Sequence, residues 1–168
     1  VNPDSSTFNF LGNGYFGGGI LRYNLFQNNQ WFFDLIGSVE HVKSKVTPTG
    51  LPELKTDLNF TTVGWGADLH RSTDLSDSYI TYNTVYSLNS GSDDAEFALA
   101  RTASDNDFQI ATLSSGHSQY FDANEIGRIS LSFKFIEADN RLPAAKMTTF
   151  GGLYSVRGYE EDEIVADG

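Results

Sequence analysis

Apolar and polar residues alternate with a period of two along most of the chain, which is the pattern of β-strands with one apolar and one polar face. The clearest segment alternates large apolar residues with serines and cations, as Ile129, Leu131, Phe133 and Phe135 against Arg128, Ser130, Ser132 and Lys134. Five further segments alternate less strictly. The pattern predicts six strands, at about 15–26, 31–42, 58–70, 79–88, 107–117 and 126–136.

The length of the predicted strands and the chemistry of their faces indicate a membrane setting. Each has roughly ten residues, whereas strands of globular proteins have about 5–6 and strands that cross a bilayer obliquely about 9–11. The polar face of one strand carries Gly64, Gly66 and Asp68, residues that a wet lumen accepts. Aromatic residues gather near strand ends, as in interfacial girdles: Trp31, Phe32, Tyr79, Tyr120 and Phe121.

The connections between the predicted strands alternate in length. Short connections fall near 27–30, 72–77 and 121–124, and long ones near 43–57, 89–106 and from 137 onward. Short turns at one end and long loops at the other are typical of an outer-membrane meander. The predicted fold class is therefore all-β, an antiparallel up-and-down transmembrane β-barrel.

The composition argues against several classes of function. The net charge of −11 and the lack of any basic run argue against nucleic acid as a partner, because nucleic-acid binders carry a basic patch. Cysteine is absent, so the chain has no disulfide and no thiolate site. No run of 18 apolar residues occurs, which excludes a membrane-spanning helix but not a barrel.

The candidate sites for cofactors are weak. The stretch 12–17 fits a dinucleotide fingerprint, but that fingerprint needs a following helix, and a strand pattern follows instead. We therefore interpret Asn13-Gly14 as a turn and predict no nucleotide site. Three histidines lack the spacing of metal ligands: His41, His70 and His117.

Other chemistry is equally sparse. The acidic run 160–163 lacks the spacing of a calcium loop and is interpreted as a solvated outer loop, with contact to a cation as the alternative. No elbow motif or Ser-His-Asp arrangement is visible. We predict no catalytic residue, no cofactor and no metal, and hence a protein that is not an enzyme.

The segment 149–159 carries one arginine between two glycine-containing corners, with aromatic residues on both sides. The glycines allow backbone angles and close approaches that a side chain would block, so this segment can fold back into a confined space. The guanidinium is a rigid fork of donors that suits a fixed carboxylate. The candidate site residues are Gly151, Gly152, Val156, Arg157, Gly158 and Tyr159.

Residues 150–159 read Phe-Gly-Gly-Leu-Tyr-Ser-Val-Arg-Gly-Tyr. They resemble the signature loop of the outer-membrane superfamily that contains the barrel-assembly insertases and the two-partner secretion transporters. The continuation through Glu-Ile-Val-Ala-Asp-Gly at 163–168 is more similar to the haemolysin-activator type. So is Ala100-Arg101 followed by Asp105-Asn106-Asp107-Phe108. The likeness is loose over most of the chain and close over its last twenty residues.

The resemblance implies that residues 1–168 are an internal fragment of one outer-membrane barrel domain, because further strands and soluble periplasmic modules are missing. Six strands alone would leave two unpaired edges, which a bilayer does not tolerate. The short turns would be periplasmic and the long loops outside. The signature loop, 137–168, would enter the lumen, where Arg157 would contact acidic and backbone groups of a later strand.

The function that this resemblance implies is type V, two-partner secretion: an unfolded partner exoprotein crosses the bacterial outer membrane through the barrel lumen. The implied partners are that exoprotein and outer-membrane lipid, with no nucleotide. One alternative is a barrel-assembly insertase of the same superfamily. A second alternative is a soluble all-β binding module whose apolar faces point inward.

Overall fold

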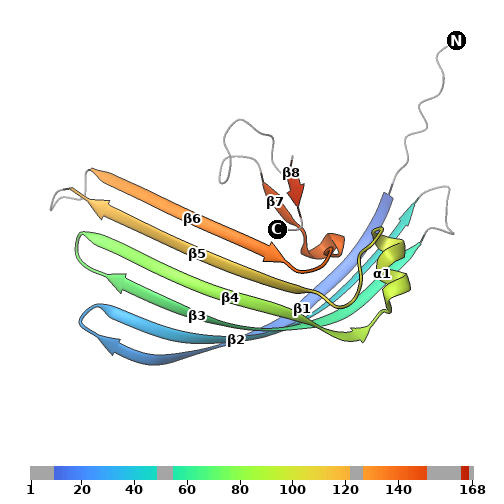
Figure 1. The fold of residues 1–168 in the computed structure, drawn as a ribbon, viewed down its shortest axis with the longest axis horizontal. Helices are drawn as coiled ribbons and strands as arrows, with labels where there is room; N and C mark the ends of the chain where they lie inside the picture. Colours follow the sequence, from blue (N-terminus) through green and yellow to red (C-terminus); the bar gives the residue numbers. More distant parts are fainter. Residues whose placement is uncertain (1–9, 49–54, 122–126, 151–163, 167–168) are drawn as a thin grey trace, which may run out of the picture.

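Six strands form one antiparallel sheet in which every strand is hydrogen-bonded to the next along the chain (Figure 1). The computed structural model describes residues 10–48, 55–121, 127–150 and 164–166. The strands of the sheet are β1 (Phe10–Asn28), β2 (Trp31–Pro48), β3 (Thr56–Ser72), β4 (Ser76–Gly91), β5 (Gln109–Tyr120) and β6 (Arg128–Ala138). The predicted all-β, up-and-down antiparallel fold is confirmed, as a sheet that is not closed.

The strands run further than the alternation predicts, because backbone pairing continues where the side chains no longer alternate. β1 has 19 residues and includes Asn13 and Gly14, which lie opposite Lys45 and Ser44 on β2. The predicted turn at Asn13-Gly14 is therefore wrong. A Cβ on Gly14 would lie 2.7 Å from the Lys43 carbonyl oxygen, so glycine here permits a close approach of two strands.

The connections differ from the prediction in two places. β2 and β3 take up much of the long connection predicted at 43–57, because they pair as far as Val46 opposite Thr56. The connection predicted at 89–106 contains a helix, α1 (Asp94–Ala100). Asp93 and Glu96 form a capping box at its start. With seven residues and one buried side chain, this helix is too short to show a helical period in the sequence.

β1 contains a bulge that changes which residue continues one of its faces. The register shifts between Asn24 and Phe26, so Phe26 lies opposite Phe33 and Leu25 has no partner. In strict alternation Leu25 would follow Leu21 and Tyr23 on the outer face, but Phe26 takes that place and stacks on Phe33 with ring centroids 5.7 Å apart. The extra residue of a bulge reverses the alternation that follows it.

The register gives the sheet two chemically distinct faces. The inner face, which is the concave side in Figure 1, is polar over most of its length, with Arg22, Asn24, Asp34, Ser38, Glu40, Thr62, Asp68, Thr81, Asn83, Thr112, Ser114, Ser118, Ser130, Ser132 and Lys134. The outer face carries Leu21, Tyr23, Phe33, Leu35, Val39, Trp65, Leu69, Ile80, Tyr82, Leu113, Ile129, Leu131, Phe133 and Phe135. Its apolar side chains are uncovered: Leu21 is 74% exposed and Leu131 70%.

The buried residues gather at one end of the inner face, where α1 and the segment after β6 cover the sheet (Figure 1). That segment contains a 3₁₀ helix, η2 (Ala144–Lys146), and continues into β7 (Thr148–Phe150), which pairs antiparallel with β8 (Ile164–Ala166). Over the described ranges, neither helix has the length and apolarity needed to span a membrane.

Candidate functional site

A charged network crosses the inner face over four strands. Arg22 on β1 places Nη1 3.1 Å from Asp34 Oδ2 on β2 and 3.3 Å from Asp68 Oδ2 on β3. Asn24 Nδ2 donates to Asp34 Oδ1 at 2.7 Å, and Thr81 Oγ1 on β4 donates to Asp68 Oδ1 at 2.9 Å. One guanidinium thus joins two carboxylates from separate strands, and neutral donors satisfy their other oxygens.

Several small hydroxyl side chains lie on the β4–β6 half of the inner face. Ser118 Oγ lies 2.9 Å from Ser130 Oγ, and Arg128 Nη2 donates to Ser118 Oγ at 2.8 Å. Ser114 lies between Thr81 and Lys134 in the register. These groups form hydrogen bonds but offer no large apolar surface, so this part of the wall is hydrophilic. Larger apolar residues of the same strands on this face, Val85, Ile110 and Ile136, lie nearer its opposite end.

Two glycines on β3 leave space for neighbouring side chains at the centre of the inner face. A Cβ on Gly64 would lie 2.6 Å from Ser38 Oγ, and one on Gly66 would lie 2.6 Å from the Tyr82 carbonyl oxygen. Real Cβ atoms do not approach other atoms so closely. Glycine at these positions therefore allows the polar side chains of β2 and β4 to lie over β3.

At the opposite end from the short turns, the inner face becomes apolar and is capped. The cap cluster consists of Val42, Leu58, Phe60, Phe97, Phe108 and Leu142. Phe97 comes from α1, and its ring centroid lies 5.5 Å from that of Phe60. Phe108 meets Phe60 edge to face at 5.8 Å. Phe97 and Leu142 are fully buried, so α1 and the segment after β6 share one small core with the sheet.

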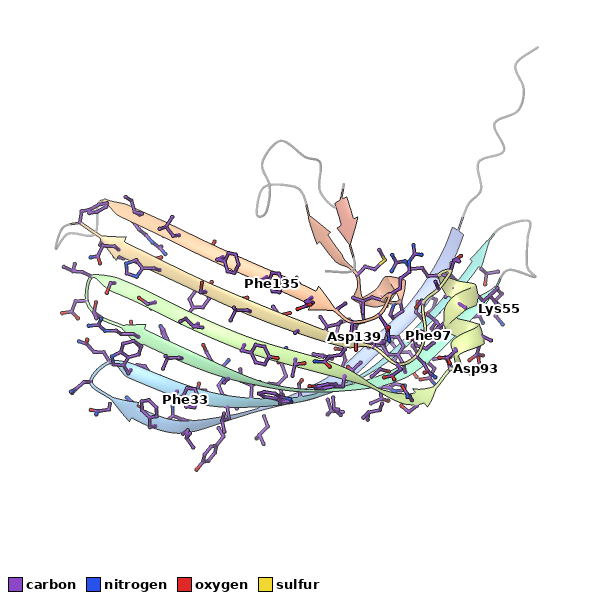
Figure 2. The ribbon with its side chains drawn as sticks, in the orientation of Figure 1. Phe33, Lys55, Asp93, Phe97, Phe135 and Asp139 are labelled. Atoms are coloured by element: carbon purple, nitrogen blue, oxygen red, sulfur yellow. The ribbon has the colours of Figure 1, made fainter. Side chains whose placement is uncertain are left out.

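Polar contacts tie the beginning of the predicted signature loop to three different strands or loops. Gln109 N on β5 donates to Asp139 Oδ1 at 2.6 Å, and Arg101 Nη1 donates to the Leu142 carbonyl at 2.6 Å. Further along, Lys146 Nζ lies 2.8 Å from Glu40 Oε2 on β2. The chain therefore crosses the inner face from β6 toward β2, and Figure 2 shows Asp139 and Phe97 at this same end of the sheet.

The predicted site residues Gly151, Gly152, Val156, Arg157, Gly158 and Tyr159 lie outside the described residues. Their flanks are described: Thr148 pairs with Ala166 and Phe150 with Ile164. Phe150 and Ile164, which flank the segment 151–163, therefore lie side by side.

The three histidines lie apart and have different partners. His41 Nδ1 is 3.0 Å from Thr61 Oγ1, His70 Nε2 is 2.8 Å from Asp77 Oδ2, and His117 Nδ1 is 2.8 Å from Ser78 Oγ. Within the described ranges, no three His, Cys, Asp or Glu side chains are grouped as metal ligands.

Sequence reasoning identified the polar face but missed the cap cluster. The sequence did contain a sign of this cluster. In the alternation of β2 and β3, Val42, Leu58 and Phe60 fall on the polar face, yet all three are apolar. A polar face that becomes apolar near a strand end needs a cover, and a nearby loop must supply it. The helix that supplies this cover has only seven residues and one buried side chain, Phe97, and is too short to show a helical period in the sequence.

The comparisons with known proteins agree with this architecture. No curated protein and no solved structure matches the chain. The model of one family, described as Haemolysin secretion/activation protein ShlB/FhaC/HecB, matches residues 21–168. Its members are outer-membrane β-barrel transporters of Gram-negative bacteria. The soluble-module alternative is wrong, because the apolar face is uncovered and the matched family is a membrane family. The chain belongs to the haemolysin secretion/activation family of outer-membrane two-partner secretion transporters.

Proposed function

We propose that this chain forms part of the wall of a barrel through which an unfolded partner exoprotein crosses the outer membrane, without nucleotide hydrolysis. The family supports outer-membrane protein secretion in general. The route through the lumen rests on one observation, the polar concave face opposite an uncovered apolar convex face.

The chemistry of the inner face suits the passage of an extended polypeptide. An unfolded chain carries unpaired backbone donors and acceptors that must exchange hydrogen bonds with water or with the wall. The hydroxyls of Ser114, Ser118 and Ser130 can take part in that exchange. Because their side chains are small and polar, they bury little apolar surface of the cargo and let it move on.

The signature loop is proposed to enter the lumen from the capped end. This proposal is supported by the anchoring of Leu142 and Lys146 over the inner face and by the paired flanks β7 and β8. Arg157 would then reach an acidic partner on a strand outside this chain. We also propose that residues 1–168 are an internal section of a larger barrel, with β1 and β6 pairing to further strands.

Crosslinking from adjacent positions on one strand tests the lumenal route. A photoreactive amino acid at Ser114 would face the inner side, and one at Leu113 would face the outer side, because neighbouring strand residues point to opposite faces. The assay uses the intact transporter in cells with an exoprotein stalled by a folded fusion domain. We expect exoprotein adducts from position 114 and none from position 113.

Two results would overturn the proposal. Equal adducts from both positions would mean that the exoprotein does not follow the inner face. The absence of adducts from position 114, while the stalled exoprotein still protrudes from the cell, would place the route elsewhere. Insertion of each variant is checked by its heat-modifiable mobility on gels.

A further inference from the structure

A hollow of about 390 Å³ interrupts the outer face near the short turns. Its walls are Trp31, Leu69, Ile80, Leu131 and Phe133, and Ser115 lies between them. The volume falls within the about 300–1,000 Å³ of small-molecule sites. The hollow exists because Ser115 is small, whereas its neighbours in the same cross-strand row, Ile80 and Phe133, are large.

The cross-strand row of residues between the hollow and the short turns has polar side chains on β3, β4 and β5. Across β2 to β6 the register aligns Trp31, Arg71, Ser78, His117 and Leu131. The Arg71 guanidinium lies 5.5 Å from the centroid of the Trp31 ring, and Ser78 Oγ lies 2.8 Å from His117 Nδ1. Ser78 and His117 thus line the apolar hollow, and the exposed Arg71 lies beside it against Trp31 on the same face.

The charge of this row differs from that of the protein as a whole. The chain has a net charge of −11, yet the outer-face positions of the described strands at this end carry no carboxylate. Two acidic residues are near in sequence: Asp74 belongs to the turn, and Asp77 lies on the inner face with His70. The Arg71 guanidinium thus faces outward without a neighbouring anion in its row.

We propose that this hollow is a binding site for one phospholipid of the periplasmic leaflet. An acyl chain occupies the hollow, and the phosphate accepts hydrogen bonds from Arg71 and Ser78. Phospholipid is the occupant because the outer face belongs to an outer-membrane barrel and is continuous with its lipid-facing surface. Arginine pairs with phosphate through its planar fork, and Trp31 suits the headgroup level of a bilayer.

The test uses the purified transporter in lipid nanodiscs that contain a phosphatidylglycerol with a photoreactive diazirine in its acyl chain. We expect labelled peptides from the β5 and β6 segments around Ser115 and Leu131. Arg71→Gln removes the cation but keeps a polar side chain of similar length. Loss of a charge-assisted hydrogen bond is expected to lower labelling at this site about tenfold at limiting probe.

The chain offers a matched control on the opposite face. Arg128 also lies 5.5 Å from an aromatic ring, that of Tyr120, but it belongs to the inner face with Ser118. Arg128→Gln is expected to leave the labelling unchanged. Ser115→Leu fills the hollow without altering charge and is expected to abolish the label, which keeps the test decisive if Arg71→Gln fails to insert. Labelling that neither Arg71→Gln nor Ser115→Leu reduces would show unselective annular lipid only and would overturn the site.

Discussion

Phe97 offers the sharpest test of how the end of the inner face is capped. It is fully buried against Phe60 and is the buried residue of α1. Replacing a core phenylalanine by alanine costs about 3–5 kcal/mol. A seven-residue helix has no stability of its own, so we expect Phe97→Ala to release α1 from the sheet while the strands stay paired.

The size of the effect follows from the energy. If the whole cost falls on the docking of α1, the population of the undocked state rises by roughly two to four orders of magnitude. Cleavage by a protease follows this population when opening and closing are fast relative to cleavage. The measurement is the initial rate of cleavage between residues 92 and 108 in the purified transporter, with barrel integrity followed by heat-modifiable gel mobility.

Leu99→Ala is the matched control, because Leu99 lies on the same helix but is 53% exposed. It removes a similar apolar side chain and is expected to change the cleavage rate little. The reasoning is refuted if Phe97→Ala and Leu99→Ala are cleaved at the same rate. It is also refuted if Phe97→Ala unfolds the whole barrel, because the cap would then not be a separate unit.

Three further predictions concern the centre of the sheet, the loop anchor and the signature loop. Gly66→Ala should destabilise the barrel by about 1–3 kcal/mol, because its Cβ would meet the backbone of β4, whereas Gly37→Ala, with no atom within 4 Å of its Cβ, should leave the urea unfolding midpoint unchanged. Glu40→Lys or Lys146→Glu alone should raise the rate of protease cleavage after β6, and the two together should return it to the wild-type rate. Since Glu40 is 38% exposed, the coupling free energy between the two residues should stay below about 1 kcal/mol. A double variant that is cleaved as fast as the single variants would contradict the ion pair. Arg157→Ala should lower secretion of the exoprotein while insertion continues, because a carboxylate partner in the lumen would lose its cation, at a cost of roughly 3–5 kcal/mol in a dry setting and less in a hydrated one; normal secretion by a correctly inserted variant would count against this role.

The predictability of each element followed the contrast between its two faces. β6 was clear in the sequence because large apolar residues such as Leu131 and Phe133 alternate with serines and cations. β5 alternates less strictly, because Ser114 and Ser115 place hydroxyls on both faces. Its position is determined by pairing with β4 and β6 rather than by its own pattern. Alternation along the sequence identifies a strand only where the environments of its two faces differ.

The candidate site divides in the same way. The segment around Arg157 could be recognised because its motif is contiguous in the sequence. The contacts of Arg22 could not, because Asp34 and Asp68 lie 12 and 46 residues further along the chain. The anchor between Lys146 and Glu40 spans 106 residues. Such pairs depend on the register of several strands at once.

Six long strands, and the face on which most of their side chains lie, could be predicted from the sequence, because the side chains of a strand alternate regardless of its neighbours. The bulge in β1 is the exception, since an extra residue shifts the alternation after Asn24. Which residues on one face meet depends on the three-dimensional fold. A slip of two residues between strands preserves the alternation but changes every cross-strand pair. The acidic pair around Arg22, the cap over Phe60 and the hollow beside Arg71 therefore follow from one particular register and from the bending of the sheet.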